Sequence, residues 1–162
     1  MGHLLFGFSG RVNRAKWWLS FLVMIIIYAV LIGAPQAFAS DQEVLIGVLG
    51  LVGAVLYIWI YLAAGAKRLH DLNKSGAWLV VFILGPIILT IIFLAVAWSA
   101  IGPSIMAGQT PGQAELAQIL GIVAIFSLLS LGFFLWWLIW FGCLRGTVGP
   151  NQYGPDPLEG KI

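Results

Sequence analysis

Four long apolar runs constrain the fold of this chain more than any other feature. They contain no acidic residue, basic residue or histidine, and they cover approximately residues 17–38, 44–66, 77–98 and 116–144. A helix of about 20 apolar residues crosses a hydrocarbon core about 30 Å thick and satisfies its own backbone hydrogen bonds. The runs therefore predict an all-α membrane protein with four transmembrane helices, folded as a single polytopic domain over residues 1–162 with a tail at 145–162.

The composition excludes a soluble globular fold. Apolar residues make up 61% of the 162 positions and charged residues 9%, whereas soluble chains average roughly 45–50% and about 25%. Fourteen charged side chains leave too little polar surface to solvate a compact fold in water, and a bilayer solvates the apolar excess. The chain is therefore expected to fold within a membrane.

The positions of the basic residues predict the orientation of the helices. All eight precede the first run, lie between the second and third, or follow the fourth: Arg11, Arg14, Lys16, Lys67, Arg68, Lys74, Arg145 and Lys161. The other two connections carry Asp41, Glu43 and Glu115 and no basic residue. Because loops rich in Lys and Arg stay in the cytoplasm, both termini and the central loop are predicted to be cytoplasmic.

A secretory signal peptide is an alternative interpretation of the N-terminal segment. Basic residues, an apolar run and Ala37-Phe38-Ala39 fit the pattern of a signal that is cleaved after Ala39. The run from Trp17 is longer than the apolar core of about 7–15 residues that is usual in such signals. Cleavage would also remove the segment around Arg11, so an uncleaved first span is favoured.

Three polar segments border the spans on the side that holds the basic residues. They are residues 8–18, FSGRVNRAKWW; residues 67–78, KRLHDLNKSGAW; and residues 146–157, GTVGPNQYGPDP. In this order and at these positions they resemble the motifs of the bacterial inner-membrane proteins grouped as domain-of-unknown-function family 805. The resemblance covers nearly the whole chain. It implies a small multi-pass protein of the bacterial inner membrane, and it implies no particular biochemical activity.

Basic and polar side chains in these segments form a candidate binding surface. Arg11 and Arg14 are three residues apart and would share one face of a helix, where guanidinium groups suit lipid phosphates. With Arg68 they are predicted to anchor the topology and contact anionic head groups of membrane lipids, to bind one defined anionic group, or to pair with acidic side chains. The cluster predicted for lipid binding, partner binding or ion pairing is Arg11, Arg14, Arg68, His70, Asp71, Asn151, Tyr153 and Asp156.

The C-terminal segment is predicted to be folded. Three prolines and three glycines between residues 146 and 157 exclude a long helix and reduce the freedom of the unfolded chain. We expect the segment to fold back under the helices, with Tyr153 packed at the interface and Asn151 and Asp156 near the arginines. A disordered tail is the alternative.

No catalytic, metal or cofactor site is predicted. His70 and Asp71 are neighbours, so on a helix they point about 100° apart, and a loop-structuring or ion-pairing role is expected for both. No serine or cysteine nucleophile has a motif context. Two histidines, His3 and His70, cannot make a site of three or four histidine ligands, and with a single cysteine a structural zinc site is not expected. The cysteine, Cys143, is predicted to be a small buried hydrophobe.

The sequence favours a non-enzymatic membrane module whose basic cytoplasmic face binds anionic lipid head groups or a protein partner. That partner would be a second copy of the chain or another membrane protein. An oligomeric transporter or channel component is the alternative, although the spans hold no acidic, basic or histidine side chain that would mark a pathway. An enzyme at the membrane surface that depends on His70 or Asp71 is a third interpretation. Nucleic-acid binding is not expected, because the basic residues are few and follow the topology.

Overall fold

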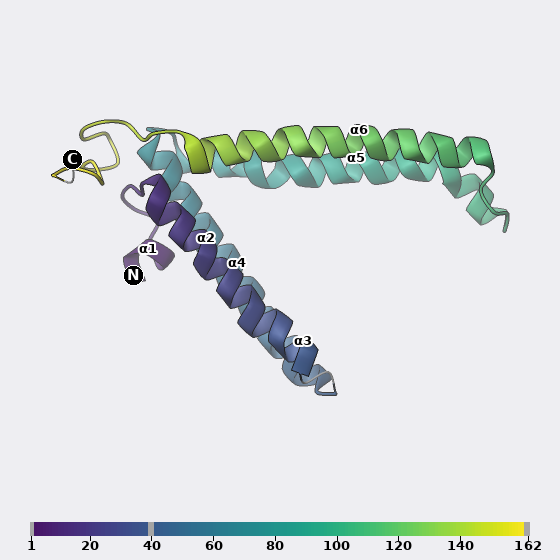
Figure 1. The fold of residues 1–162 in the computed structure, drawn as a ribbon, viewed down its shortest axis with the longest axis horizontal. Coiled ribbons are helices and arrows are strands. Elements are labelled where there is room, and N and C mark those ends of the chain that lie inside the picture. Colours follow the sequence, from purple (N-terminus) through teal and green to yellow (C-terminus); the bar gives the residue numbers. More distant parts are fainter. Residues whose placement is uncertain (1, 39–40, 161–162) are drawn as a thin grey trace. The chain divides into compact units, whose positions relative to one another are not determined.

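The structure is a computed structural model that describes residues 2–38 and 41–160, and its long elements are helices (Figure 1). Many of their large apolar side chains are exposed, including Leu51, Ile91 and Leu120, each by at least 60%. Such surface is costly in water and is solvated by lipid. The prediction of an all-α membrane protein is confirmed by four stretches long and apolar enough to span a bilayer: Arg14–Phe38, Glu43–Asp71, Gly76–Met106 and Gln113–Cys143.

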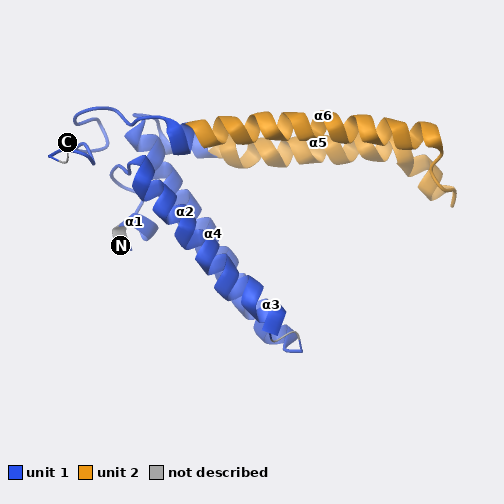
Figure 2. Cartoon of the chain, in the orientation of Figure 1, with its two compact units in different colours: residues 1–79, 140–162 blue, residues 80–139 orange. Residues whose placement is uncertain are grey.

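The chain divides into two compact units (Figure 2). Unit 1 comprises Met1–Leu79 and Trp140–Ile162, and unit 2 comprises Val80–Ile139. The three polar segments all belong to unit 1. In chain order the elements are α1 (Gly2–Phe6), α2 (Arg14–Tyr28), the π-helix η1 (Ala29–Gly33), α3 (Ala34–Phe38), α4 (Glu43–Asp71), the 3-10 helix η2 (Gly76–Trp78), α5 (Leu79–Met106), α6 (Gln113–Leu138) and the π-helix η3 (Ile139–Cys143).

Helix α2 begins at Arg14 because Asn13 caps it. Asn13 has an extended backbone, and its side-chain oxygen accepts a hydrogen bond from the Lys16 N–H at 2.9 Å, which satisfies an amide that has no partner within the helix. Arg11 therefore lies outside the helix, so the condition under which Arg11 and Arg14 would share one helix face is not met. The side chain of Arg11 is buried, whereas Arg14 is exposed.

The first span changes helix type before Pro35. In η1 the Ala34 N–H donates to the Ala29 carbonyl, five residues earlier, which is the π-helical pattern. Pro35 has no N–H with which to continue the α-helical ladder, yet the chain stays helical to Phe38, where the span was predicted to end. The cleavage site considered after Ala39 lies outside the described residues.

Helices α2 and α4 pack side by side in unit 1 (Figure 1). The first span continues along α4 through η1, where Gly53 of α4 is buried and an added Cβ would lie 3.2 Å from side-chain atoms of both Leu31 and Ile32. The absent side chain lets α4 and η1 approach closely. Trp17 and Met24 of α2 are buried in this unit.

Helix α4 continues to Asp71 instead of ending at residue 66. Its end is set by Asn73, which adopts a left-handed φ of 56° that asparagine tolerates. The Lys74 N–H donates to the Leu69 carbonyl at 2.8 Å, which closes the last turn. Residues 67–71, expected in a loop between spans, therefore lie on a helix, and Arg68 and Asp71 share one of its faces as an i,i+3 pair.

Helices α5 and α6 form unit 2. The rings of Phe93 and Phe126 stack with centroids 4.3 Å apart, and a Cβ added to Gly85 would lie 2.7 Å from the Phe133 ring. Helix α5 runs unbroken through two prolines to Met106, beyond the end predicted at residue 98. Aromatic and small residues thus hold the two long helices together within this unit.

Candidate functional site

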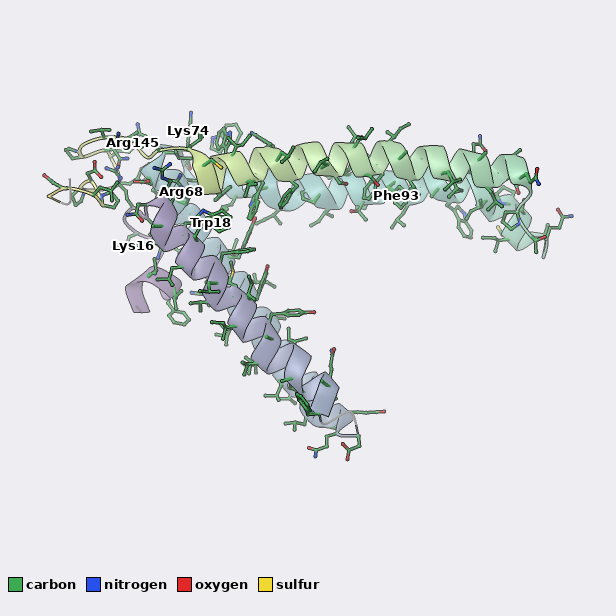
Figure 3. The ribbon with its side chains drawn as sticks, in the orientation of Figure 1. Lys16, Trp18, Arg68, Lys74, Phe93 and Arg145 are labelled. Carbon is green, nitrogen blue, oxygen red and sulfur yellow. The ribbon has the colours of Figure 1, made fainter. Side chains whose placement is uncertain are left out.

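The three polar segments meet at one end of unit 1. Arg68, labelled in Figure 3, lies there on the last turns of α4. The N-terminal segment and the C-terminal tail contribute the other side chains through contacts that span most of the sequence. We call this cluster the polar junction, and it consists of Arg11, Arg68, His70, Asp71, Thr147, Asn151 and Tyr153.

Asp71 lies between two arginines at the centre of the polar junction. Its Oδ1 accepts from Arg11 Nε at 3.1 Å, and its Oδ2 accepts from Arg68 Nη1 at 2.7 Å. The side chains of Arg11, Arg68 and Asp71 are exposed by only 1%, 0% and 3%. Charges removed from water in this way need partners with good geometry, and charge-assisted bonds to both carboxylate oxygens supply them.

Arg68 also binds the end of the fourth span. Its Nε donates to the Phe141 carbonyl at 2.8 Å, and its Nη2 donates to the Leu144 carbonyl. The last carbonyls of a helix have no partner within that helix, so one guanidinium satisfies two of them. Arg68 thereby fixes the end of η3 against the end of α4.

Arg11 reaches the tail with its remaining donors. Its Nη1 donates to the Gly149 carbonyl at 2.6 Å and to the Gly154 carbonyl at 3.3 Å, and its Nη2 donates to the Thr147 carbonyl. These carbonyl dipoles point their negative ends at a guanidinium that has to share Asp71 with Arg68. The tail therefore helps to solvate the buried charge.

The tail has a glycine at position 146 because Asp71 lies too close there for any side chain. A Cβ added to Gly146 would lie 2.0 Å from Asp71 Oδ2. The next residue, Thr147, donates its N–H to the Asp71 carbonyl at 2.8 Å and its hydroxyl to the same oxygen at 3.1 Å. The tail thus lies directly against the C-terminal end of α4.

His70 and Tyr153 stack face to face in the polar junction. Their ring centroids are 4.0 Å apart and the rings are inclined by 6°. His70 Nδ1 lies 3.1 Å from the Gly10 carbonyl, so the imidazole also contacts the N-terminal segment. Asn151 Nδ2 donates to the His70 carbonyl at 2.9 Å, and the backbones of Asn151 and Gly154 exchange two hydrogen bonds of 3.0 Å. The tail folds back as a structured turn.

Asp156 stabilises the tail itself and forms no side-chain hydrogen bond with an arginine in the described parts of the chain. Its two carboxylate oxygens accept from the Leu158 and Gly149 N–H groups, each at 2.9 Å. These two bonds, with smaller contributions from nearby Arg11 and Arg145, hold the pKa of the Asp156 carboxyl below its ordinary value. Asp156 therefore orders the backbone of the tail and does not form a hydrogen-bonded pair with one of the predicted arginines.

A polar cavity of about 150 Å³ lies beside the polar junction. Arg14 contributes an exposed guanidinium, which donates to the Cys143 carbonyl at 3.1 Å. The guanidinium of Arg145 is also exposed and makes no hydrogen bond or ion pair with any residue of the described ranges. The lining residues are Asn13, Arg14, Asp71, Arg145, Gly146, Thr147, Asp156 and Leu158.

Sequence reasoning missed three contributors to this end of the molecule. Lys67 is 1% exposed and donates from Nζ to the Leu4 carbonyl, although it was expected to serve only as a topology signal. Thr147 and Gly146 were not predicted as site residues, and the only signal for them was their position at the start of the third motif. Cys143 is exposed, so its prediction as a buried hydrophobe is wrong. It lies at the end of η3, where its carbonyl accepts a hydrogen bond from Arg14 and its side chain is not covered.

These features define a class of protein: a multi-pass, all-helical membrane protein in which the three polar segments, residues 8–18, 67–78 and 146–157, together form one polar junction. The chain belongs to the family described as "Protein of unknown function (DUF805)", whose profile matches residues 5–155. The resemblance inferred from the three motifs is therefore confirmed.

Relatives of this chain in Escherichia coli cover it almost completely. Inner membrane protein YhaI of strain K12 is 32% identical over 157 residues, which span 96% of this chain and 89% of YhaI. Inner membrane protein YhaH is 24% identical over 153 residues, or 93% and 87% of the two chains. The protein YiiR is 26% identical over 164 residues, or 97% and 90%. No solved structure matches this chain.

Proposed function

We propose that this protein is a non-enzymatic membrane module of the inner membrane whose exposed cations bind anionic lipid head groups at the cytoplasmic surface. The observation that carries the proposal is the division of the described cations into two sets. Arg11, Lys67 and Arg68 are buried and bound to other groups of the chain. The exposed set consists of Arg14, Lys16, Lys74 and Arg145.

The exposed cations lie where spans begin or end, which is the level of lipid phosphates. Arg14 and Lys16 are on the first turn of α2, and Arg145 follows η3. Figure 3 shows Lys16, Lys74 and Arg145 at the same end of unit 1 as Trp18. Tryptophan prefers the head-group boundary, and each cation near an anionic leaflet contributes about 1 kcal/mol. This arrangement supports lipid contact by the exposed set, while the buried set holds the fold.

A cytoplasmic position for both termini is part of the proposal. It is supported by the positive-inside rule, since the described connections at the opposite ends of the spans carry Asp41, Glu43 and Glu115. Reporter fusions after residue 162 and within residues 107–112 test it. We expect a cytoplasmic signal from the first and a periplasmic signal from the second, and the reverse pattern would contradict the orientation.

The absence of a catalytic role is supported by the engagement of the two candidate residues. His70 Nδ1 faces the Gly10 carbonyl under the Tyr153 ring, and both oxygens of Asp71 bind arginines. The transporter alternative has less support. The hydroxyls of Ser20 and Thr90 donate to carbonyls of their own helices, which does not indicate a polar pathway.

Lipid titration followed by native mass spectrometry tests head-group binding. The protein in mild detergent would be titrated with phosphatidylglycerol, and the comparison would be a variant in which the four exposed cations become alanine. We expect the affinity for phosphatidylglycerol to fall by about 1,000-fold, because four cations contribute about 1 kcal/mol each. A control with the same number of exposed polar residues changed to alanine, at Gln42, Gln109, Gln113 and Gln152, should keep its affinity. Equal affinities in all three proteins would contradict the proposal.

A further inference from the structure

The cavity beside the polar junction has the size of a small polar ligand. Its volume of about 150 Å³ is comparable to that of a cavity that holds a benzene ring of six heavy atoms. A phosphate group has five heavy atoms and fits such a space. The wall is formed by residues at the start of α2, by Asp71 at the end of α4 and by the segment after η3, so it is assembled from three distant parts of unit 1.

The charges around the cavity leave a positive excess. Arg14, Arg145, Asp71 and Asp156 line it. Both carboxylates are already engaged: that of Asp71 by two further guanidinium groups, of Arg11 and Arg68, and that of Asp156 by backbone N–H groups. Four positive charges against two negative charges favour a ligand that carries two negative charges.

The cavity also offers hydrogen-bond donors with no internal acceptor. A guanidinium has five N–H donors. Arg14 uses one of them on the Cys143 carbonyl, and Arg145 uses none on the residues that the structure describes. The side-chain oxygen of Asn13 accepts from Lys16, which leaves its amide nitrogen as a further donor. Two guanidinium forks on one small cavity suit the oxygens of a phosphate.

We propose that this cavity binds a phosphate monoester dianion through Arg14, Arg145 and Asn13. The inference rests on the proposed function, because it assigns a defined ligand chemistry to part of the same cationic face. A phosphate monoester carries a charge of about −1.5 to −2 near neutral pH, which matches the excess around the cavity, whereas a phosphodiester carries one negative charge. The group can come from a lipid with a terminal phosphate or from a soluble phosphate.

Competitive lipid binding tests the site on the intact chain. Native mass spectrometry of the protein in mild detergent would be carried out with dioleoyl phosphatidic acid, with dioleoyl phosphatidylglycerol, and with inorganic phosphate as competitor. We expect phosphatidic acid to bind about ten-fold more tightly than phosphatidylglycerol. The double variant Arg14→Ala/Arg145→Ala should bind phosphatidic acid about 300-fold more weakly, because it loses two surface cations, about 30-fold, and the roughly ten-fold preference for a monoester. Lys16→Ala/Lys74→Ala, with the same change in charge outside the cavity, should lose about 30-fold and keep the preference for phosphatidic acid.

The outcomes separate this inference from the proposed function. Equal losses in the two double variants would overturn the site and leave a diffuse lipid-binding face. Retention of neither lipid by the wild-type protein would overturn both proposals. Displacement of phosphatidic acid by inorganic phosphate from the wild type supports the site and assigns it to a soluble ligand. Arg145→Lys keeps the charge and removes the guanidinium fork. If this variant shows the thermal transition of a folded protein and binds phosphatidic acid with the wild-type affinity, bidentate binding by Arg145 is overturned.

Discussion

The guanidinium of Arg11 and the carboxylate of Asp71 form a buried ion pair across sixty residues of sequence, with Nη2 and Oδ1 3.1 Å apart. The same guanidinium binds carbonyls of the tail, including that of Gly149, and the same carboxylate binds Arg68. One pair of charges therefore connects the N-terminal segment, the end of α4 and the C-terminal tail. The polar junction depends on it.

Replacing Asp71 by asparagine should destabilise the protein strongly. The change leaves Arg11 and Arg68 buried without a counter-charge, and breaking a buried pair in this way costs about 3–5 kcal/mol. The free energy of unfolding can be measured by denaturant titration in detergent micelles. Asp41→Asn changes an exposed carboxylate at the other end of the span and should stay within about 0.5 kcal/mol of the wild type. Similar losses in both variants would refute a central role for Asp71.

Replacing Gly146 by alanine should release the tail. The added Cβ would lie 2.0 Å from Asp71 Oδ2, so the tail has to move, at a cost of about 1–3 kcal/mol. Trypsin should then cleave after Arg145 faster than in the wild type. Gly132→Ala in α6 meets nothing within 4 Å and serves as the control. Unchanged cleavage in the Gly146 variant would show that the tail does not press against Asp71.

Replacing Tyr153 should separate the effect of its ring from that of its hydroxyl. Tyr153→Ala removes the stack on His70 and should cost about 0.5–1.5 kcal/mol, while Tyr153→Phe keeps the ring and should cost less. The readout is the NMR shift of the His70 ring protons. We expect a ring-current displacement in the wild type and the phenylalanine variant and its loss in the alanine variant. The same shift in all three proteins would argue against the stack.

The tail turn should loosen in acid through Asp156. Hydrogen bonds from Leu158 and Gly149 hold its pKa below the ordinary value of 3.8, so the folded tail binds the proton less tightly than the unfolded tail. The contribution to stability is therefore present above pH 3.8 and is lost as the pH falls through the lower, folded value. Carbon NMR of the Asp156 carboxyl should show a midpoint below 3.8. Asp156→Asn should remove this acid-dependent step from the exchange rate of the Leu158 amide.

The sequence predicted the spans because uncharged apolar runs and bilayer thickness decide them. The ends were less predictable. Helix α4 continues through Lys67 and Asp71 because no residue before Asn73 favours a break, although their charge suggested a loop. Helix α5 runs beyond residue 98 because helical backbone satisfies its own hydrogen bonds past the apolar run.

The roles of individual cations could not be predicted from local sequence. Arg11 and Arg14 stand in the same motif, but the Asn13 cap separates them, so that one is buried and the other is exposed. Their fates depend on partners that lie far away in the sequence, such as Asp71 and the Gly149 carbonyl. Motif order showed that the three segments matter together, but pairing across sixty or more residues required the structure.

Residue-resolved hydrogen exchange of the intact protein in lipid nanodiscs tests the central claim, that the tail is folded onto the polar junction. The structure predicts slowed exchange at amides whose hydrogen bonds form the turn and its contact with α4: Thr147, Gly149, Asn151, Tyr153, Gly154 and Leu158. Wild-type protection at these positions, lost throughout in Asp71→Asn, is the expected result. Exchange at the rate of an unstructured peptide across residues 147–158 in the wild type would contradict it.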